Sequence, residues 1–400
     1  MKRPTPEDLL NDLRPEARNE PESSIMTVIN HGFGRQGLIP LWAGEGNLPT
    51  PRFICDAAVK GLEDGETFYT WQRGIPELRD ALARYHARLY GTPFEAENFF
   101  VTGGGMQSIQ TAIQAIAGEG DEVVLPTPAW PNYAGPLRMK GSRPVEVPMT
   151  FAPSGWQLDL DRLFDAVTER TKAIVVNTPS NPLGWVAPAE DLLAIRDFAR
   201  ERGLWIVSDE VYARYYFPQD EAAGPLPPSF LDICDTEERL IMTNTFSKNW
   251  AMTGWRMGWM VAPQALGDVL ENLIQYNTSG TAAFMQRAGV VALDEGEDFL
   301  AEQVRQAREG RDIAYAALSS VDGARFAVPE GAFYLFFTLD GMTDSTETAL
   351  RIIDEAGVGL APGAAFGPGG EAFLRLCFLR ERGQLVEAMD RLTRWLARNR

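Results

Sequence analysis

From about residue 76 onward, short apolar runs alternate with stretches of helical periodicity. The runs FFVTG, EVVLP, AIVVN, LWIVSD, RLIMTN and MGWMVA follow one another between residues 99 and 262, without the polar alternation of a strand that has one solvated face. Strands that are covered on both faces have this pattern, and helices are their usual cover. The sequence therefore predicts an α/β fold with a large, doubly wound and mainly parallel sheet.

The helical stretches and a change of pattern predict the domain organisation. PELRDALARYHARLYG is amphipathic and stops at Gly91, and FFVTG, the helix after it and EVVLP should form a βαβ unit. After about residue 290 the chain reads as a long helix, strands near FAVPE and FYLFF, and a final helix, QLVEAMDRLTRWLARN. We therefore expect a large domain of residues 51–285 and a smaller α+β domain of residues 1–50 and 286–400.

Charge and cysteine content exclude several classes of protein. The 37 basic and 55 acidic residues give a net charge of −18 without a basic run, so nucleic acid is not an expected partner. Cys55, Cys234 and Cys377 are widely spaced, which indicates a reducing compartment, most simply the cytoplasm, and no metal site. No stretch approaches the roughly 20 apolar residues of a membrane span, so no membrane partner is expected.

One of the five lysines has an unusual setting. Lys248 lies in NTFSKNWAMTGWRMGW among aromatic residues, where desolvation would favour a neutral amine that can form an imine. A lysine that extends from an apolar surface is the alternative. Thr245, Ser247 and Arg256 nearby would supply two hydroxyls and a guanidinium, which suit a phosphate.

Polar residues follow several of the predicted strands. Asp209 ends LWIVSD, where ligands of open α/β sheets bind, and Tyr212 could face the same crevice. The loop NTPSNPLG could aim Asn181 inward. Ordinary turns also use Asp, Asn and Pro, so these residues alone leave both interpretations open.

Two glycine-rich segments have different expected roles. VTGGGMQS comes after a strand and before a helix, so its backbone N–H groups can converge on a phosphate. GFGRQG at 32–37 matches a dinucleotide-binding pattern, but the LIPLWAGEG that follows is not helical. The dinucleotide interpretation requires a strand, a turn and then a helix, so we do not adopt it.

The chain resembles fold-type I enzymes that depend on pyridoxal phosphate (PLP), in particular the class I/II aminotransferases. The resemblance covers nearly the whole sequence, through the ordered motifs AGEGNLPTP, YTWQRGIPELRDAL, VTGGGMQ, PTPAWPNY, NTPSNPLG, SDEVY, SKNWAMTGWRMGW, PEGAFYLF and FLRLCF. It implies PLP as the cofactor and a homodimer with shared active sites. It also implies transfer of an amino group from an L-amino acid to a 2-oxo acid.

The resemblance assigns roles to individual residues. Lys248 would form the Schiff base and carry the proton, Asp209 would pair with the pyridine nitrogen, and Tyr212 and Asn181 would bind the ring oxygen. Trp130 would stack on the ring. The phosphate would be held by Gly104, Gly105, Met106, Thr245, Ser247, Arg256 and, from a second subunit, Tyr69. Arg375 would bind the substrate carboxylate, with Gly44, Trp130 and Asn181 beside it.

The substrate is the least determined feature. Met106 stands where several aspartate-specific relatives carry a lysine, and QYNTSGTAAFM has no arginine for a distal carboxylate. Trp71, Met106 and Trp130 should form an apolar pocket, which favours a neutral, bulky or aromatic donor. PAWPNY resembles enzymes that act on aspartate, so aspartate aminotransferase stays an alternative, as do a PLP-dependent C–S lyase and a cyclopropane-forming synthase.

Overall fold

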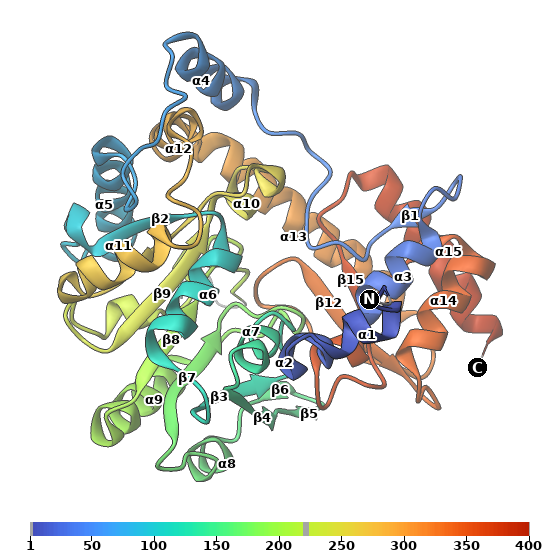
Figure 1. The fold of residues 1–400 in the computed structure, drawn as a ribbon. Helices are drawn as coiled ribbons and strands as arrows, with labels where there is room; N and C mark the ends of the chain where they lie inside the picture. Colours follow the sequence, from blue (N-terminus) through green and yellow to red (C-terminus); the bar gives the residue numbers. More distant parts are fainter. Residues whose placement is uncertain (1–2, 219–223, 400) are drawn as a thin grey trace.

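The computed structural model describes residues 3–218 and 224–399, and a seven-stranded sheet forms the centre of its larger part (Figure 1). The strand order is β2-β10-β9-β8-β7-β3-β4. The strands are β2 (Phe99–Thr102), β3 (Glu122–Thr127), β4 (Arg143–Pro148), β7 (Thr171–Asn177), β8 (Trp205–Asp209), β9 (Leu240–Thr245) and β10 (Gly258–Val261). Only β10 runs antiparallel to its neighbours, so the predicted mainly parallel sheet is confirmed.

Helices cover both faces of this sheet, as its apolar strands require. One face packs against α6 (Gly105–Ile116), α7 (Ala134–Met139) and α11 (Gly267–Gln275). The other face packs against α5 (Pro76–Tyr90), α8 (Leu160–Asp165), α9 (Ala189–Arg202) and α12 (Ala283–Glu295), with α4 (Arg52–Glu63) beside α12. The sheet is therefore doubly wound, as predicted.

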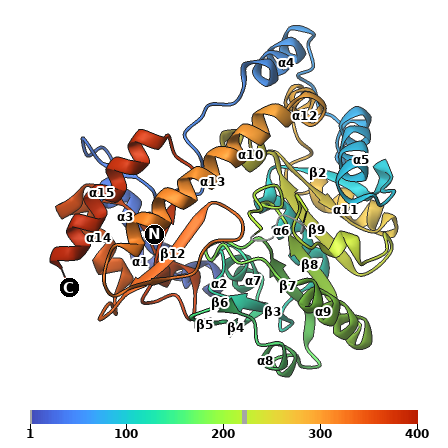
Figure 2. The ribbon, with the colours of Figure 1, turned by 180° about the vertical axis from the view of Figure 1, so that it is seen from behind.

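A second, antiparallel sheet has the order β11-β12-β15-β14 and a core of its own. Its strands are β11 (Ala324–Phe326), β12 (Tyr334–Leu339), β14 (Ala361–Pro362) and β15 (Leu374–Cys377). Helices α13 (Glu297–Ser319), α14 (Ser345–Ala356) and α15 (Arg382–Arg398) accompany it, and α13 runs from the large sheet to this one (Figure 2). The predicted change to an α+β pattern is confirmed.

The N-terminal segment joins the second part of the molecule. Strand β1 (Ile39–Pro40) pairs in parallel with β13 (Val358–Gly359), and α3 (Ser24–Gly32) packs on α14. The remaining elements are α1 (Pro6–Asn11), α2 (Pro15–Arg18), β5 (Thr150–Ala152), β6 (Gly155–Gln157), α10 (Phe246–Asn249) and the 3₁₀ turns at Ala96–Asn98, Phe230–Asp232, Thr253–Trp255, Gln264–Leu266 and Gly363–Phe366. Because GFGRQG follows helix α3 and precedes β1, the order is helix, turn, strand, opposite to a dinucleotide fingerprint.

Two details of the predicted organisation need comment. β2 and β3 lie in one sheet and run parallel, but β10, β9, β8 and β7 separate them, because β2 pairs at the sheet edge with the antiparallel β10. They are therefore not the two adjacent strands of a simple βαβ unit, which the sequence had predicted. The domain division after residue 285 falls within α12, which packs on α4 and α5, and the division stays a prediction.

Candidate functional site

A cavity of about 400 Å³ opens at the carboxyl ends of β7, β8 and β9. Open α/β sheets bind their ligands at this edge. Most of the residues singled out from the sequence line this cavity: Gly44, Gly105, Met106, Trp130, Asn181, Asp209, Tyr212, Thr245, Ser247, Lys248, Arg256 and Arg375. Ile25 and Ile29 of α3 and Trp42 close it from the N-terminal side.

Lys248 points into this cavity from α10, the short helix that follows β9. Its Nζ donates a hydrogen bond of 2.7 Å to the carbonyl oxygen of Gly44. Desolvation lowers the pKa of the Lys248 amine to about 8, so roughly one tenth of the amine is neutral at pH 7, far more than for an unperturbed lysine. A surface lysine would be solvated and charged, so this geometry favours a nucleophilic amine.

Asp209 is the last residue of β8 and is only 3% exposed. The Tyr133 hydroxyl donates to Asp209 Oδ2 at 2.5 Å, and the Val211 N–H donates to Oδ1 at 3.2 Å. Burial raises the pKa of Asp209 to about 6, while these two hydrogen bonds oppose the rise. A protonated nitrogen placed against the carboxylate would lower the pKa again, so Asp209 suits a cationic heterocycle.

Asn181 and Tyr212 are held by partners from distant parts of the chain. The Tyr212 and Tyr334 hydroxyls share a hydrogen bond of 2.7 Å. Asn177, at the end of β7, accepts from the Asn181 N–H at 2.8 Å and donates to the Asp209 carbonyl at 3.0 Å. The loop that carries Asn181 is therefore fixed to the end of the strand that carries Asp209.

Arg375 on β15 is buried, and its guanidinium lies 4.4 Å from the centre of the Tyr334 ring and 4.9 Å from that of Phe366. Nη1 donates to Asn181 Oδ1 at 2.7 Å, and Nη2 donates to the Trp42 carbonyl oxygen. Nε has no partner within residues 3–218 and 224–399. A guanidinium held this rigidly beside a cavity is suited to a carboxylate, which it can bind through two parallel hydrogen bonds.

The residues expected at a phosphate converge at the start of α6. Arg256 adopts a left-handed backbone with a φ of 52°, and a Cβ built on Gly104 would lie 2.9 Å from its Nη2. The Thr245 and Ser247 hydroxyls lie 2.8 Å apart in the same cavity. A helix N-terminus, two hydroxyls and a guanidinium, with only glycine between, form a cradle that fits a phosphate. Gly104 contributes by this lack of a side chain.

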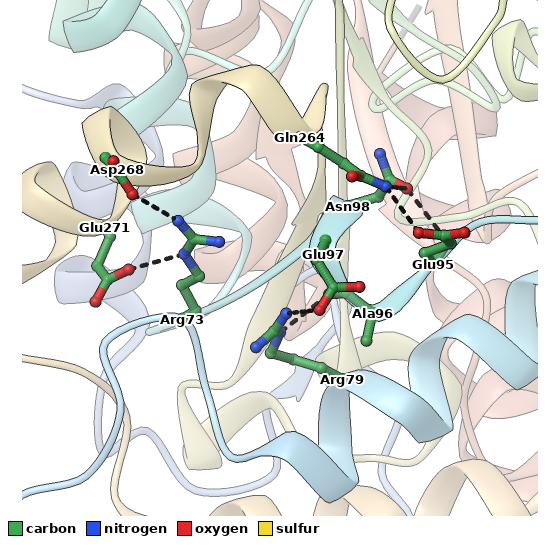
Figure 3. A network of polar contacts seen from close by, with 9 residues as sticks. All are labelled: Arg73, Arg79, Glu95, Ala96, Glu97, Asn98, Gln264, Asp268 and Glu271. Carbon is green, nitrogen blue, oxygen red and sulfur yellow. Dashed lines mark hydrogen bonds and ion pairs between the residues drawn. The ribbon is translucent and has the colours of Figure 1, made fainter.

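Two residues named from the sequence, Tyr69 and Trp71, lie elsewhere in this single chain. Tyr69 is 94% exposed and lies with Phe68 beside residues 278–282. Trp71 is 66% exposed and outside the cavity, so the expected wall of Trp71, Met106 and Trp130 retains only the last two. Arg73 is bound by Asp268 and Glu271 of α11, and Figure 3 shows it directed at these two carboxylates.

The fold and the cavity together define a class of protein: enzymes that use PLP to transfer amino groups between amino acids and 2-oxo acids. The family described as aminotransferase class I and II matches residues 37–392, and the chain belongs to this family. The expected family and fold class are thereby confirmed.

Curated relatives cover nearly the whole chain but carry different substrate names. An aspartate aminotransferase of Pyrococcus horikoshii is 33% identical and covers 94% of both chains. A probable aspartate/prephenate aminotransferase of Aquifex aeolicus is 36% identical, covering 90% of this chain and 91% of its own. Aromatic-amino-acid aminotransferase 2 of Thermococcus litoralis is 35% identical, over 94% and 95%.

Solved structures agree with this assignment. The Thermus thermophilus aspartate aminotransferase with maleate superimposes with a TM-score of 0.86 at 32% identity, over 96% of this chain and 99% of that one. The aromatic aminotransferase of Pyrococcus horikoshii gives a TM-score of 0.85 at 31% identity, over 93% and 99%. The substrate therefore has to be argued from the cavity of this chain.

Proposed function

We propose that this aminotransferase takes a neutral, bulky or aromatic L-amino acid as its donor and holds PLP as a Schiff base on Lys248. One observation carries the choice of substrate. Within residues 3–218 and 224–399, the cations that line the catalytic cavity are Lys248, Arg256 and Arg375, and the proposed cofactor and substrate carboxylate use all three. Ile25, Ile29, Met106 and Trp130 supply apolar surface, and a distal carboxylate buried there without a partner would be strongly destabilised.

The reaction requires that one group carry a proton between two carbons. When bound, PLP supplies an electron sink for the charge released as the substrate Cα–H bond breaks. Lys248 then takes up and returns this proton, which its lowered pKa permits near neutral pH. The Asp209 carboxylate would keep the ring nitrogen protonated, and Tyr133 holds this carboxylate in position.

The remaining residues orient the reactants. Arg375 binds the α-carboxylate, and its contacts with Asn181 and Trp42 fix the plane of the guanidinium. Asn181 and Tyr212 would donate to the ring oxygen, and Trp130 would stack on the ring. The phosphate would be bound by Gly104, Gly105, Met106, Thr245, Ser247 and Arg256, and Gly44 would lie beside the substrate carboxylate. This set selects α-amino acids over simple amines.

Aspartate is the main alternative donor, because several relatives are named aspartate aminotransferases. A C–S lyase would use the same cofactor residues and is distinguished by 2-oxo acid formation without an acceptor.

We also infer a homodimer in the cytoplasm. The exposed Tyr69 would reach the phosphate of a second subunit, and Phe68, Trp71 and Tyr276 are exposed beside it. The three cysteines are free thiols, which supports a reducing compartment. Among the residues that the structure describes, no helix is long and apolar enough to cross a membrane.

Borohydride reduction and peptide mapping test the assignment of Lys248. The purified protein should be yellow, and the reduced cofactor should be found on the peptide that contains Lys248. Lys248→Ala should lose the visible absorbance, whereas Lys140→Ala, the matched control, should keep it. A label on Lys2, Lys60, Lys140 or Lys172 would show that the assignment is wrong. A panel of amino acids with 2-oxoglutarate and with pyruvate then gives the donor and the acceptor.

A further inference from the structure

A second cavity of about 590 Å³ adjoins the catalytic one. Met106, Trp130 and Asn132 line both cavities, and Asn132 Nδ2 donates to Met106 Sδ at 3.2 Å. The partition therefore includes side chains, which can move more readily than backbone. A long substrate side chain that passes Met106 and Trp130 would enter this outer chamber.

Charged groups line the outer chamber where α7, β4 and residues 364–368 meet the N-terminal segment. Arg138 of α7 forms an ion pair with Glu20, with Nη2 to Oε1 at 2.6 Å and Nε to Oε2 at 3.1 Å. Glu20 therefore already occupies two donors of this guanidinium. Glu22 is exposed at the rim, and Glu146 of β4 is half-buried inside.

The Glu146 carboxylate has no hydrogen-bond or ion-pair partner within residues 3–218 and 224–399. Burial raises the pKa of its carboxyl, and the charge of Arg138 opposes the rise. Its Oε1 lies 2.8 Å from the position that a Cβ on Gly367 would occupy, and Thr127 lies beside it. The buried Thr127 hydroxyl, on the same chamber wall, also lacks a partner in the described chain. A ligand that donates hydrogen bonds would give these unpaired oxygens the partners that they lack, and would therefore bind more favourably than one that does not.

We propose that Glu146 is a specificity-determining residue that accepts hydrogen bonds from the distal end of a long substrate side chain, either an amide or a protonated amine. This inference rests on the proposed aminotransferase reaction, and it extends the proposed neutral, bulky donors to side chains whose distal end is an amide or a cationic amine. Because Glu20 and Arg138 neutralise each other, Glu146 leaves the chamber with negative charge. A distal carboxylate would be repelled there, whereas an amine would be attracted.

The test compares kcat/KM for four donors with 2-oxoglutarate: L-lysine and L-glutamine, and the apolar L-norleucine and L-methionine. The variants are Glu146→Gln and, as a matched control on the exposed rim of the same chamber, Glu22→Gln. Glu146→Gln should lower kcat/KM for lysine by about 10-fold or more, mainly through KM, because glutamine keeps an acceptor oxygen but not the negative charge that strengthens the hydrogen bond from an ammonium group. Glutamine should lose less, the apolar donors should change less than about 2-fold, and Glu22→Gln should behave as wild type.

Equal effects of Glu146→Gln on all four donors, or no effect on lysine, would overturn the proposal. The wild type gives a second measure, because lysine must have a higher kcat/KM than norleucine. Glu20→Gln frees Arg138, and if this variant made 2-aminoadipate the best donor in the series, the chamber would be a carboxylate site instead. If the enzyme transaminates methionine but Glu146→Gln changes kcat/KM equally for all four donors, only this inference is contradicted. Absence of transamination with every donor contradicts the proposed function.

Discussion

At residue 106, one side chain decides whether the catalytic cavity can neutralise a distal carboxylate. Met106 lies against Asn132 and Trp130, with no cation free beside it among the described residues. Met106→Lys should therefore raise kcat/KM for aspartate, by about 10-fold or more, and lower it for methionine and phenylalanine. Steady-state kinetics with these donors on the wild type and the variant measure the change.

Met106→Leu is the matched control for this prediction, because it changes shape without adding charge. It should leave the ratio of aspartate to methionine close to that of the wild type. A wild-type enzyme that already prefers aspartate by tenfold or more would contradict the apolar interpretation of the cavity. The motif PAWPNY would then have been the better guide to the substrate.

The sequence predicted those residues whose role follows from their position in a strand or a motif. Asp209 ends a strand, and Lys248 lies in an aromatic segment directly after another. Tyr133 was not singled out, although it lies in the quoted PTPAWPNY motif, because its contact with Asp209 joins residues 76 positions apart. Tyr334 and Trp42 are similar, because their contacts with Tyr212 and Arg375 join residues far apart in the sequence and become visible only in the folded chain.

Helix α5 shows how an element can carry a buried titratable group for structural reasons. His86 lies on its inner face, only 1% exposed, and its Nε2 accepts a hydrogen bond of 3.0 Å from the Trp259 indole of β10. Desolvation lowers the pKa of His86 to about 3, against 6.5 for a free histidine. This contact gives His86 a structural role, because a neutral ring is needed to accept the indole proton.

This burial predicts how stability depends on pH. Between pH 6.5 and pH 3 the unfolded state binds a proton at His86 and the folded state does not, so the free energy of unfolding falls as the pH falls. The contribution of His86 to the slope should approach about 1.4 kcal/mol per pH unit well below pH 6.5. The raised pKa values of Asp209 and Glu210 act in the opposite direction, so the contribution is measured as a difference between proteins that share these two carboxyls. Urea unfolding at pH 7, 6 and 5 should show that acid destabilises the wild type and His31→Gln, the exposed control, relative to His86→Gln. The same pH dependence in all three proteins would contradict the prediction.

Element order was harder to predict than element identity. The six strands predicted between residues 99 and 262 are present within one or two residues, because covered strands and amphipathic helices have distinct periodicities. The strand expected near FAVPE instead ends at its first residue, since β11 spans Ala324–Phe326. The pairing of β10 between β2 and β9 could not be predicted, because an antiparallel strand at this place has the same apolar composition as its parallel neighbours. The boundary between the two packed parts could not be predicted from the sequence either, since α12 continues without interruption through residue 285.

At the scale of the whole molecule, one surface remains to be explained. Phe68 is 83% exposed, Tyr69 94%, Trp71 66% and Tyr276 87%. Residues 67–70 lie against residues 278–282, so Phe68 and Tyr69 share one region of the surface, and Trp71 and Tyr276 are close to these two segments in the sequence. Contiguous exposed apolar surface of this kind is typical of protein–protein interfaces. A symmetric dimer would bury the surface and bring Tyr69 to the partner's cavity.

Complementation between two inactive variants tests this shared site directly. In Tyr69→Ala the phosphate loses the hydroxyl that the neighbour supplies, and in Lys248→Ala the chain loses its own amine, so each homodimer should have little activity. A mixed dimer contains one site with both residues intact, because Lys248 of one chain meets Tyr69 of the other. Random co-assembly makes half of the dimers mixed, each with one working site, and should restore about one quarter of wild-type activity. Sedimentation at the assay concentration should give twice the mass of one chain. If the mixture stays inactive although mixed dimers form, or if an active monomer sediments, Tyr69 does not complete a neighbouring site.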